Sequence, residues 1–161
     1  MNELVVEALI EIPHGSQNKY EVDKKNDRII LDRPLYSAML YPGEYGYIEN
    51  TLARDNDPID ILVFNSFPTF PGCVIESRVI GMLEMEDAGE EDVKLIAVSN
   101  RDPRFNHVQT LDDLPPHYLV EVRHFFDTYK ELQDKKVITG EWLGIEEAKS
   151  YLDDAIERFK K

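Results

Sequence analysis

The stretch Asp55-Asn56-Asp57-Pro58-Ile59-Asp60-Ile61-Leu62-Val63 sets three carboxylates at the entrance of an apolar run. Pro58 disfavours helical backbone at Asp57, so the acidic half is extended or turned. A turn at Pro58 brings the side chain of Asp60 round to the other two carboxylates. The apolar residues of 59–63 then predict a strand with Asp60 at its start, and hence a fold that is rich in β-structure.

The three carboxylates have two explanations. Ionised carboxylates at contact distance repel each other strongly where the dielectric constant is low, so they either stay solvated or are neutralised by a divalent cation. Mg²⁺ prefers such oxygen ligands. Taken alone, such a stretch is more often a solvated polar loop, because Asp, Asn and Pro are common turn residues. An EF-hand calcium loop is excluded, because its twelfth position counted from Asp55 is Ser66 and not Glu.

Short strands are predicted on both sides of this stretch. They cover residues 4–6, 8–12, 20–23, 28–31, 45–48, 73–86 and 93–98, with a hairpin turn at residues 25–27. Towards the end of the chain the apolar period changes to that of a helix, over residues 116–133 and again over residues 145–159. Strands followed by helices indicate a mainly β or α+β fold, with two main helices packed outside a sheet or barrel.

Composition restricts the classes of function. The chain has 161 residues, 42% of them hydrophobic, which excludes general disorder. With 18 Lys and Arg against 32 Asp and Glu, the net charge is −14. Such a chain is a poor general partner for nucleic acid or an anionic membrane. Because no repeat or linker divides the sequence, we expect a single domain over residues 1–161.

The compartment is also predicted from the sequence. A single cysteine, Cys73, forms no internal disulfide, which suits a reducing compartment. The opening residues carry Glu but no Lys or Arg, unlike a secretory signal, and no stretch of about 18 apolar residues spans a bilayer. We therefore expect a cytoplasmic protein.

Further charged and tyrosyl side chains recur near the predicted strand ends. Asp92 and Lys94 lie two residues apart and so share one face of a strand, as do Lys19 and Glu21. The structural alternatives are surface ion pairs, an exposed acidic hairpin and tyrosines packed in the core. Carboxylates for metal, cations for an anion and tyrosine hydroxyls together suit a phosphate ester or anhydride. No Ser or Cys has a neighbouring base in sequence, so nucleophilic catalysis has no support.

These motifs together resemble the soluble inorganic pyrophosphatases of the short bacterial type. The motifs are Asp55 to Ile61, Ile10-Glu11-Ile12-Pro13, Lys19-Tyr20-Glu21, Asp32-Arg33, Tyr41-Pro42 with Tyr45-Gly46-Tyr47, Asp87 to Lys94, and Tyr129-Lys130. The resemblance covers essentially the whole chain. It implies a five-stranded closed barrel of the oligonucleotide/oligosaccharide-binding (OB) type with two main helices outside, and a homo-oligomer, specifically a hexamer. The stretch from Ser99 to His107 matches none of these motifs.

The resemblance also implies a role for each site residue. The metal ligands are Asp55, Asp60, Asp92, Asp87, Glu21 and Glu11. The groups that bind pyrophosphate and phosphate are Lys19, Arg33, Tyr45, Lys94, Tyr129 and Lys130. Tyr45 also orients groups near the nucleophile, and Asp57 is the general base. The expected cofactor is Mg²⁺, several ions per site, with Mn²⁺ or Zn²⁺ able to substitute.

The reaction that follows is hydrolysis of pyrophosphate to two orthophosphates by a metal-activated water, without a phosphorylated enzyme. Two alternatives remain open at this point. One is a barrel that binds divalent cations or oligonucleotides without catalysis, and the other is a phosphatase for nucleotides or organic diphosphates. Tight ligand binding without turnover would indicate the non-catalytic barrel, and a substrate panel discriminates the phosphatase from an enzyme that hydrolyses pyrophosphate.

Overall fold

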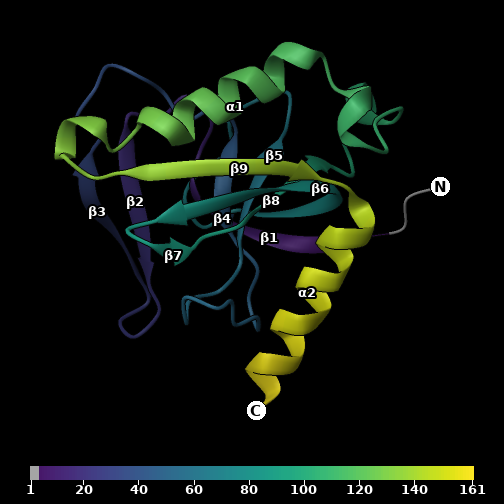
Figure 1. Cartoon of the computed structure of the whole chain (residues 1–161), viewed down its shortest axis with the longest axis horizontal. Coiled ribbons are helices and arrows are strands. Elements are labelled where there is room, and N and C mark those ends of the chain that lie inside the picture. Colours follow the sequence, from purple (N-terminus) through teal and green to yellow (C-terminus); the bar gives the residue numbers. More distant parts are fainter. Residues whose placement is uncertain (1–3) are drawn as a thin grey trace.

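The computed structural model describes residues 4–161 (Figure 1). Its strands are β1 (Val5–Ile12), β2 (Asn18–Asp23), β3 (Arg28–Pro34), β4 (Glu44–Tyr47), β5 (Asp60–Phe64), β6 (Val74–Asp87), β7 (Glu90–Glu91), β8 (Lys94–Ser99) and β9 (Val137–Leu143). Its α-helices are α1 (Pro116–Thr128) and α2 (Ile145–Lys160), and three 3₁₀ turns lie at Pro103–Phe105, Leu111–Asp113 and Glu131–Gln133. Within this described range, no helix is long and apolar enough to cross a membrane.

Five strands close into a ring. Their order is β1, β4, β5, β8 and β6, and β6 pairs back onto β1. All of these pairings are antiparallel except the parallel pairing of β5 with β8. The predicted five-stranded closed barrel is therefore confirmed. The β2–β3 hairpin forms a separate two-stranded sheet at the end of the molecule away from α2 (Figure 1).

The central strands β5 and β8 are buried on both faces, which explains why they read as unbroken apolar runs. Leu62 and Ile96 belong to the core that includes α1, whereas Ile61 and Leu95 belong to the core that includes α2. The two helices lie on different sides of the barrel, with α1 crossing one side and α2 running down another (Figure 1). The prediction of two outer helices is thus confirmed.

One close backbone approach explains the tyrosine-rich motif. Gly46 pairs with Ile10 across β1 and β4, beside an irregularity in the register. A Cβ atom at Gly46 would lie 1.9 Å from the carbonyl oxygen of Leu9, so β1 and β4 meet only because this residue has no side chain. Tyr45 and Tyr47 on either side are both buried.

Two details differ from the sequence analysis. The predicted first helix extends to residue 133, but α1 ends at Thr128 and a 3₁₀ turn follows. Leu132, the last residue of the predicted stripe, is 63% exposed, so nothing there buries a further helical turn. The second is β9, a strand that the sequence analysis does not assign. Among the strands of residues 4–161 it pairs with β6 alone, it is half-exposed along most of its length and it carries Gly140 in its middle, so its apolar pattern is weak.

Candidate active site

The predicted site residues come together around one cavity of about 500 Å³. Nine carboxylates line it but only four ammonium groups, so its charge is strongly negative. The acidic residues are Glu11, Glu21, Asp55, Asp57, Asp60, Asp87, Glu90, Glu91 and Asp92, and the basic ones are Lys19, Lys24, Lys94 and Lys130. Tyr45 and Tyr129 line the same cavity. Arg33 is the one predicted site residue that does not line it.

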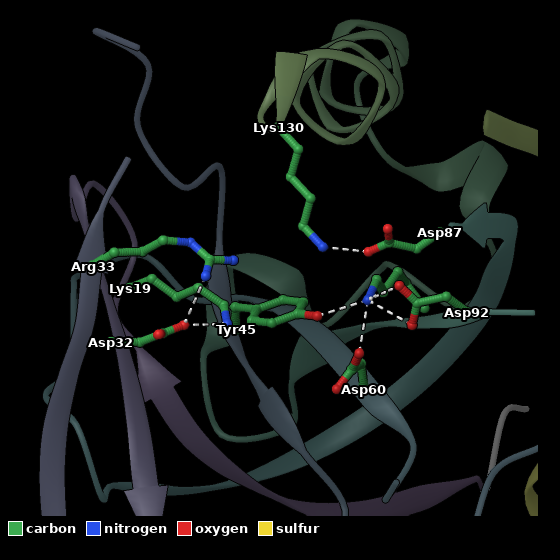
Figure 2. A network of polar contacts seen from close by, with 9 residues as sticks. Lys19, Asp32, Arg33, Tyr45, Asp60, Asp87, Asp92 and Lys130 are labelled. Atoms are coloured by element: carbon green, nitrogen blue, oxygen red, sulfur yellow. Dashed lines mark hydrogen bonds and ion pairs between the residues drawn. The ribbon is translucent and has the colours of Figure 1, made fainter. Parts of the chain in front are cut away.

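The centre of the site is the ammonium group of Lys94. Its Nζ donates to the Tyr45 hydroxyl at 2.7 Å, to Asp60 at 2.7 Å and to both oxygens of Asp92 at 3.0 Å. Figure 2 shows Tyr45, Asp60 and Asp92 converging on this single nitrogen. The barrel register explains the meeting, because Asp60 lies opposite Lys94 in the parallel β5–β8 pair and Tyr45 pairs with Leu62 on the neighbouring strand.

The acidic stretch before β5 is a tight turn and not an extended segment. The backbone N–H of Asp57 donates to Oδ1 of Asp55 at 3.1 Å, and Asn56 has a left-handed backbone with φ of 69°. The N–H of Ala53 bonds to the carbonyl of Asp57 at 2.8 Å, which closes the turn. The turn brings the carboxylates of Asp55 and Asp57 to the cavity together with Asp60.

A second ion pair spans the cavity from a different element. Lys130 follows the end of α1 and forms an ion pair with Asp87 at the end of β6 (Figure 2). Lys130 also lies 5.4 Å from the ring centroid of Tyr129, which is buried. Sequence positions more than forty residues apart thus meet at this side of the cavity.

The β2–β3 hairpin supplies a third group of charges. Lys19 and Arg33 are paired in its register, and Asp32 contacts both, at 2.8 Å and 3.5 Å (Figure 2). The hydrogen bond from Lys19 holds the pKa of Asp32 below its usual value. Sequence reasoning assigned no role to Asp32. The signal that would have found it is its position beside Arg33 in a hairpin whose other strand carries Lys19.

Burial raises the pKa values of several carboxyl groups in the cavity. For Asp55, burial is the largest cause and the negative charges of Asp57, Asp92 and Asp60 add to it. For Asp92, burial again dominates, and Lys94 acts in the opposite direction. Burial raises the pKa of Glu11 to about 7. Burial disfavours the charged form of Lys94 too, yet the neighbouring Asp60, Tyr45 and Asp92 raise its pKa well above the usual value.

The donor set fits a divalent cation. Clustered oxygen donors and an excess of negative charge favour binding of a hard cation, which would also relieve the burial and the repulsion that raise the carboxyl pKa values. Over residues 4–161, however, no three His, Cys, Asp or Glu side chains stand arranged as a ready-made metal cage. Asp55, Asp60 and Asp92 share the cavity, but the Lys94 ammonium stands between the last two.

Comparison with known proteins identifies the family. The model of the family described as inorganic pyrophosphatase matches residues 8–160. The chain belongs to the inorganic pyrophosphatase family. Two relatives that carry this name are those of Geobacillus stearothermophilus, 57% identical over 98% of this chain and 95% of the relative, and of Halalkalibacterium halodurans, 58% identical over 97% and 96%.

Solved structures support the same conclusion for the fold. The crystal structure of the Thermus thermophilus inorganic pyrophosphatase has a TM-score of 0.95 and 43% identity, covering 99% of this chain and 93% of that one. The barrel with two outer helices is therefore the OB-like fold of this family. Membership in the inorganic pyrophosphatases also implies dependence on a divalent metal.

Proposed function

We propose that the chain hydrolyses inorganic pyrophosphate to two orthophosphates in the cavity described above, with Mg²⁺ as its preferred cation and Mn²⁺ or Zn²⁺ able to substitute. The family match over residues 8–160 is the observation that carries this proposal. The cavity supports it, because a nest of carboxylates repels a free polyanion and admits one only when cations reverse the local charge.

The carboxylates take the roles that the family resemblance implies. Asp55, Asp60 and Asp92 would hold the tighter ions, and Asp87, Glu21 and Glu11 would assist further ions. A bound divalent ion supplies positive charge for the anion and lowers the pKa of a bound water.

Asp57 is proposed as the general base. Its side chain is exposed at the cavity, and its backbone N–H is held by the Asp55 carboxylate, which fixes the turn. Among the residues described, no hydrogen bond or ion pair engages the Asp57 carboxylate itself, so its oxygens are available to accept a proton from the attacking water. The neighbouring carboxylates are engaged, because Asp55 accepts the N–H of Asp57 and Asp60 accepts from the Lys94 ammonium.

The phosphate groups would be bound by cations from three elements. Lys19 and Arg33 come from the β2–β3 hairpin, Lys130 with Tyr129 from the segment after α1, and Lys94 from β8. Tyr45 directs its hydroxyl to the Lys94 ammonium and so orients the groups near the nucleophile. These cations would stabilise the charge that develops on the phosphoryl oxygens.

The proposal extends to the assembly and its compartment. We infer a homo-oligomer, a hexamer, in the cytoplasm, with residues 1–161 acting as one domain. Large exposed apolar side chains support an interface between copies, among them Phe67 and Phe70, each 64% exposed, and Val74, 48% exposed.

Phosphate release from pyrophosphate, measured with and without Mg²⁺, tests the activity. We expect release only with the metal, and no turnover of nucleoside di- or triphosphates in a substrate panel.

Asp57→Asn is expected to slow turnover about 10²–10⁴-fold while metal affinity is kept, as for loss of a general base. Asp154→Asn, an exposed change on α2, serves as the matched control. Asp60→Ala is expected to weaken Mg²⁺ binding as well as rate. Native turnover in Asp57→Asn would remove the base role.

A further inference from the structure

The ammonium group of Lys94 has no hydrogen-bonding capacity left. A lysine ammonium has three N–H donors. Tyr45, Asp60 and Asp92 take all three, and the residue is 1% exposed. The aromatic rings of Tyr45 and Phe126 lie 5.3 Å and 5.5 Å from the nitrogen and help to enclose it.

This arrangement conflicts with two roles at once. The proposed function requires Asp60 and Asp92 to hold a cation and Lys94 to bind phosphate. While Lys94 donates to both carboxylates, it has no donor for a phosphate oxygen, and the two carboxylates already have a cation. The same three groups therefore have two alternative pairings.

We propose that Lys94 and a divalent cation compete for the carboxylates of Asp60 and Asp92, so that cation binding releases the Lys94 ammonium to the phosphate. This inference rests on the proposed function and adds to it an exchange of partners by Lys94. The exchange keeps each partner paired throughout. The carboxylates exchange one cation for another, and the ammonium exchanges carboxylate oxygens for phosphate oxygens.

Charge and mobility both favour the exchange. One buried ammonium facing two partly buried carboxylates leaves a net negative charge, which a dication neutralises more fully. Once a dication is bound, its charge repels the ammonium, and the flexible four-carbon stem of lysine allows the nitrogen to move to a new acceptor. Lys130 and Lys19 form their ion pairs with other carboxylates, Asp87 and Asp32.

Lys24 provides a matched control. It lines the same cavity and carries the same charge, but its nitrogen lies over the ring of Tyr47, 4.3 Å from the centroid. Removing Lys24 alters the general potential of the cavity without freeing the carboxylates of Asp60 and Asp92. A difference between Lys94→Met and Lys24→Met therefore reports the direct competition.

The experiment is calorimetric titration of Mg²⁺ in the absence of phosphate. Lys94→Met is expected to bind Mg²⁺ about 10–100-fold more tightly than the unaltered protein, given the strength of charge interactions at contact distance. Lys24→Met is expected to change the affinity less than about threefold. Equal or weaker Mg²⁺ binding by Lys94→Met would overturn the proposal, because Lys94 would then support the cation site instead of competing for it.

A second measurement uses the unaltered protein and does not depend on the folding of a variant. The ¹⁵N resonance of the Lys94 ammonium, assigned by comparison with Lys94→Arg, is followed during titration with Mg²⁺ and then with orthophosphate. We expect Mg²⁺ alone to shift it and to raise phosphate affinity, and phosphate in turn to raise Mg²⁺ affinity by the same factor. A resonance that Mg²⁺ leaves in place would refute the exchange. Absence of pyrophosphate hydrolysis in the unaltered protein would instead refute the proposed function.

Discussion

Glu44 offers a sharp test of how the scaffold beneath the site is held. It lies at the start of β4, next to Tyr45, and is completely buried. One carboxylate oxygen accepts the backbone N–H of Thr69 at 2.6 Å, and the other accepts the N–H of His14. Glu44 thereby ties the turn before β2 and the loop before β6 to the barrel, and no ion pair to it occurs among residues 4–161.

The isosteric change Glu44→Gln keeps the shape but replaces one acceptor oxygen with an NH₂ group. That group must face one of the two backbone donors, so one charge-assisted bond is lost and one buried N–H is left unpaired. The loss of such a partner costs about 1–3 kcal/mol, an amount reduced because a buried charge also disappears. At roughly 2–4 °C per kcal/mol for a chain of this size, we expect Tm to fall by about 2–12 °C.

The assay is unfolding by guanidinium chloride and by heat at a fixed protein concentration. Glu49→Gln, the same chemical change at an exposed position five residues away, is the control and should stay within about 0.5 kcal/mol of the unaltered protein. Mg²⁺ affinity of Glu44→Gln should remain native, because Glu44 does not line the cavity. If Glu44→Gln and Glu49→Gln have the same unfolding midpoints in guanidinium chloride and in heat, the two backbone hydrogen bonds to Glu44 do not stabilise the fold as argued.

Three other changes have clear expected results. Gly46→Ala should abolish stable folding, seen by circular dichroism, because its Cβ would lie 1.9 Å from the Leu9 carbonyl oxygen; a native melting curve would contradict this. Burial acts to raise the pKa of Asp102, but hydrogen bonds from Ser66 and Arg104 outweigh it and hold that pKa below its usual value. Its ionised form therefore stabilises the fold above the unfolded-state pKa. Asp102→Asn should lower the free energy of unfolding in urea at pH 7, and this loss should shrink as pH falls to about 3. A loss of stability that grows at lower pH would contradict a lowered folded-state pKa for Asp102. Cys73→Ser should retain pyrophosphate hydrolysis, and a folded but inactive product would show that the thiol matters.

The stretch from Ser99 to His107 acquires a structural role in three dimensions. The buried guanidinium of Arg78 donates to the carbonyls of Phe105 and Val108 and to the side chain of Asn100. Asp102 accepts the N–H of Ser66 from the loop after β5. These contacts join residues far apart in sequence, so no local pattern could indicate them.

Local pattern was enough where burial is complete. The runs in β5 and β8 are apolar on both faces because α1 covers one core and α2 the other, and such runs stand out in any sequence. It was insufficient at the end of α1, where Leu132 continues the helical period but remains exposed. It also failed at β9, an edge strand whose half-exposed residues give a weak signal.

The sequence by itself determined the chemistry available to this protein: its carboxylate-rich stretch before β5, its charged pairs at alternating positions and its resemblance to inorganic pyrophosphatases. The tertiary structure alone decided which charges face each other. Lys94 meets Asp60 and Tyr45 through the register of β4, β5 and β8, Lys130 meets Asp87, and Asp32 joins Lys19 to Arg33. The physical reason is that electrostatic interactions depend on distance and burial, and both are set by strand pairing between segments that lie far apart in the sequence.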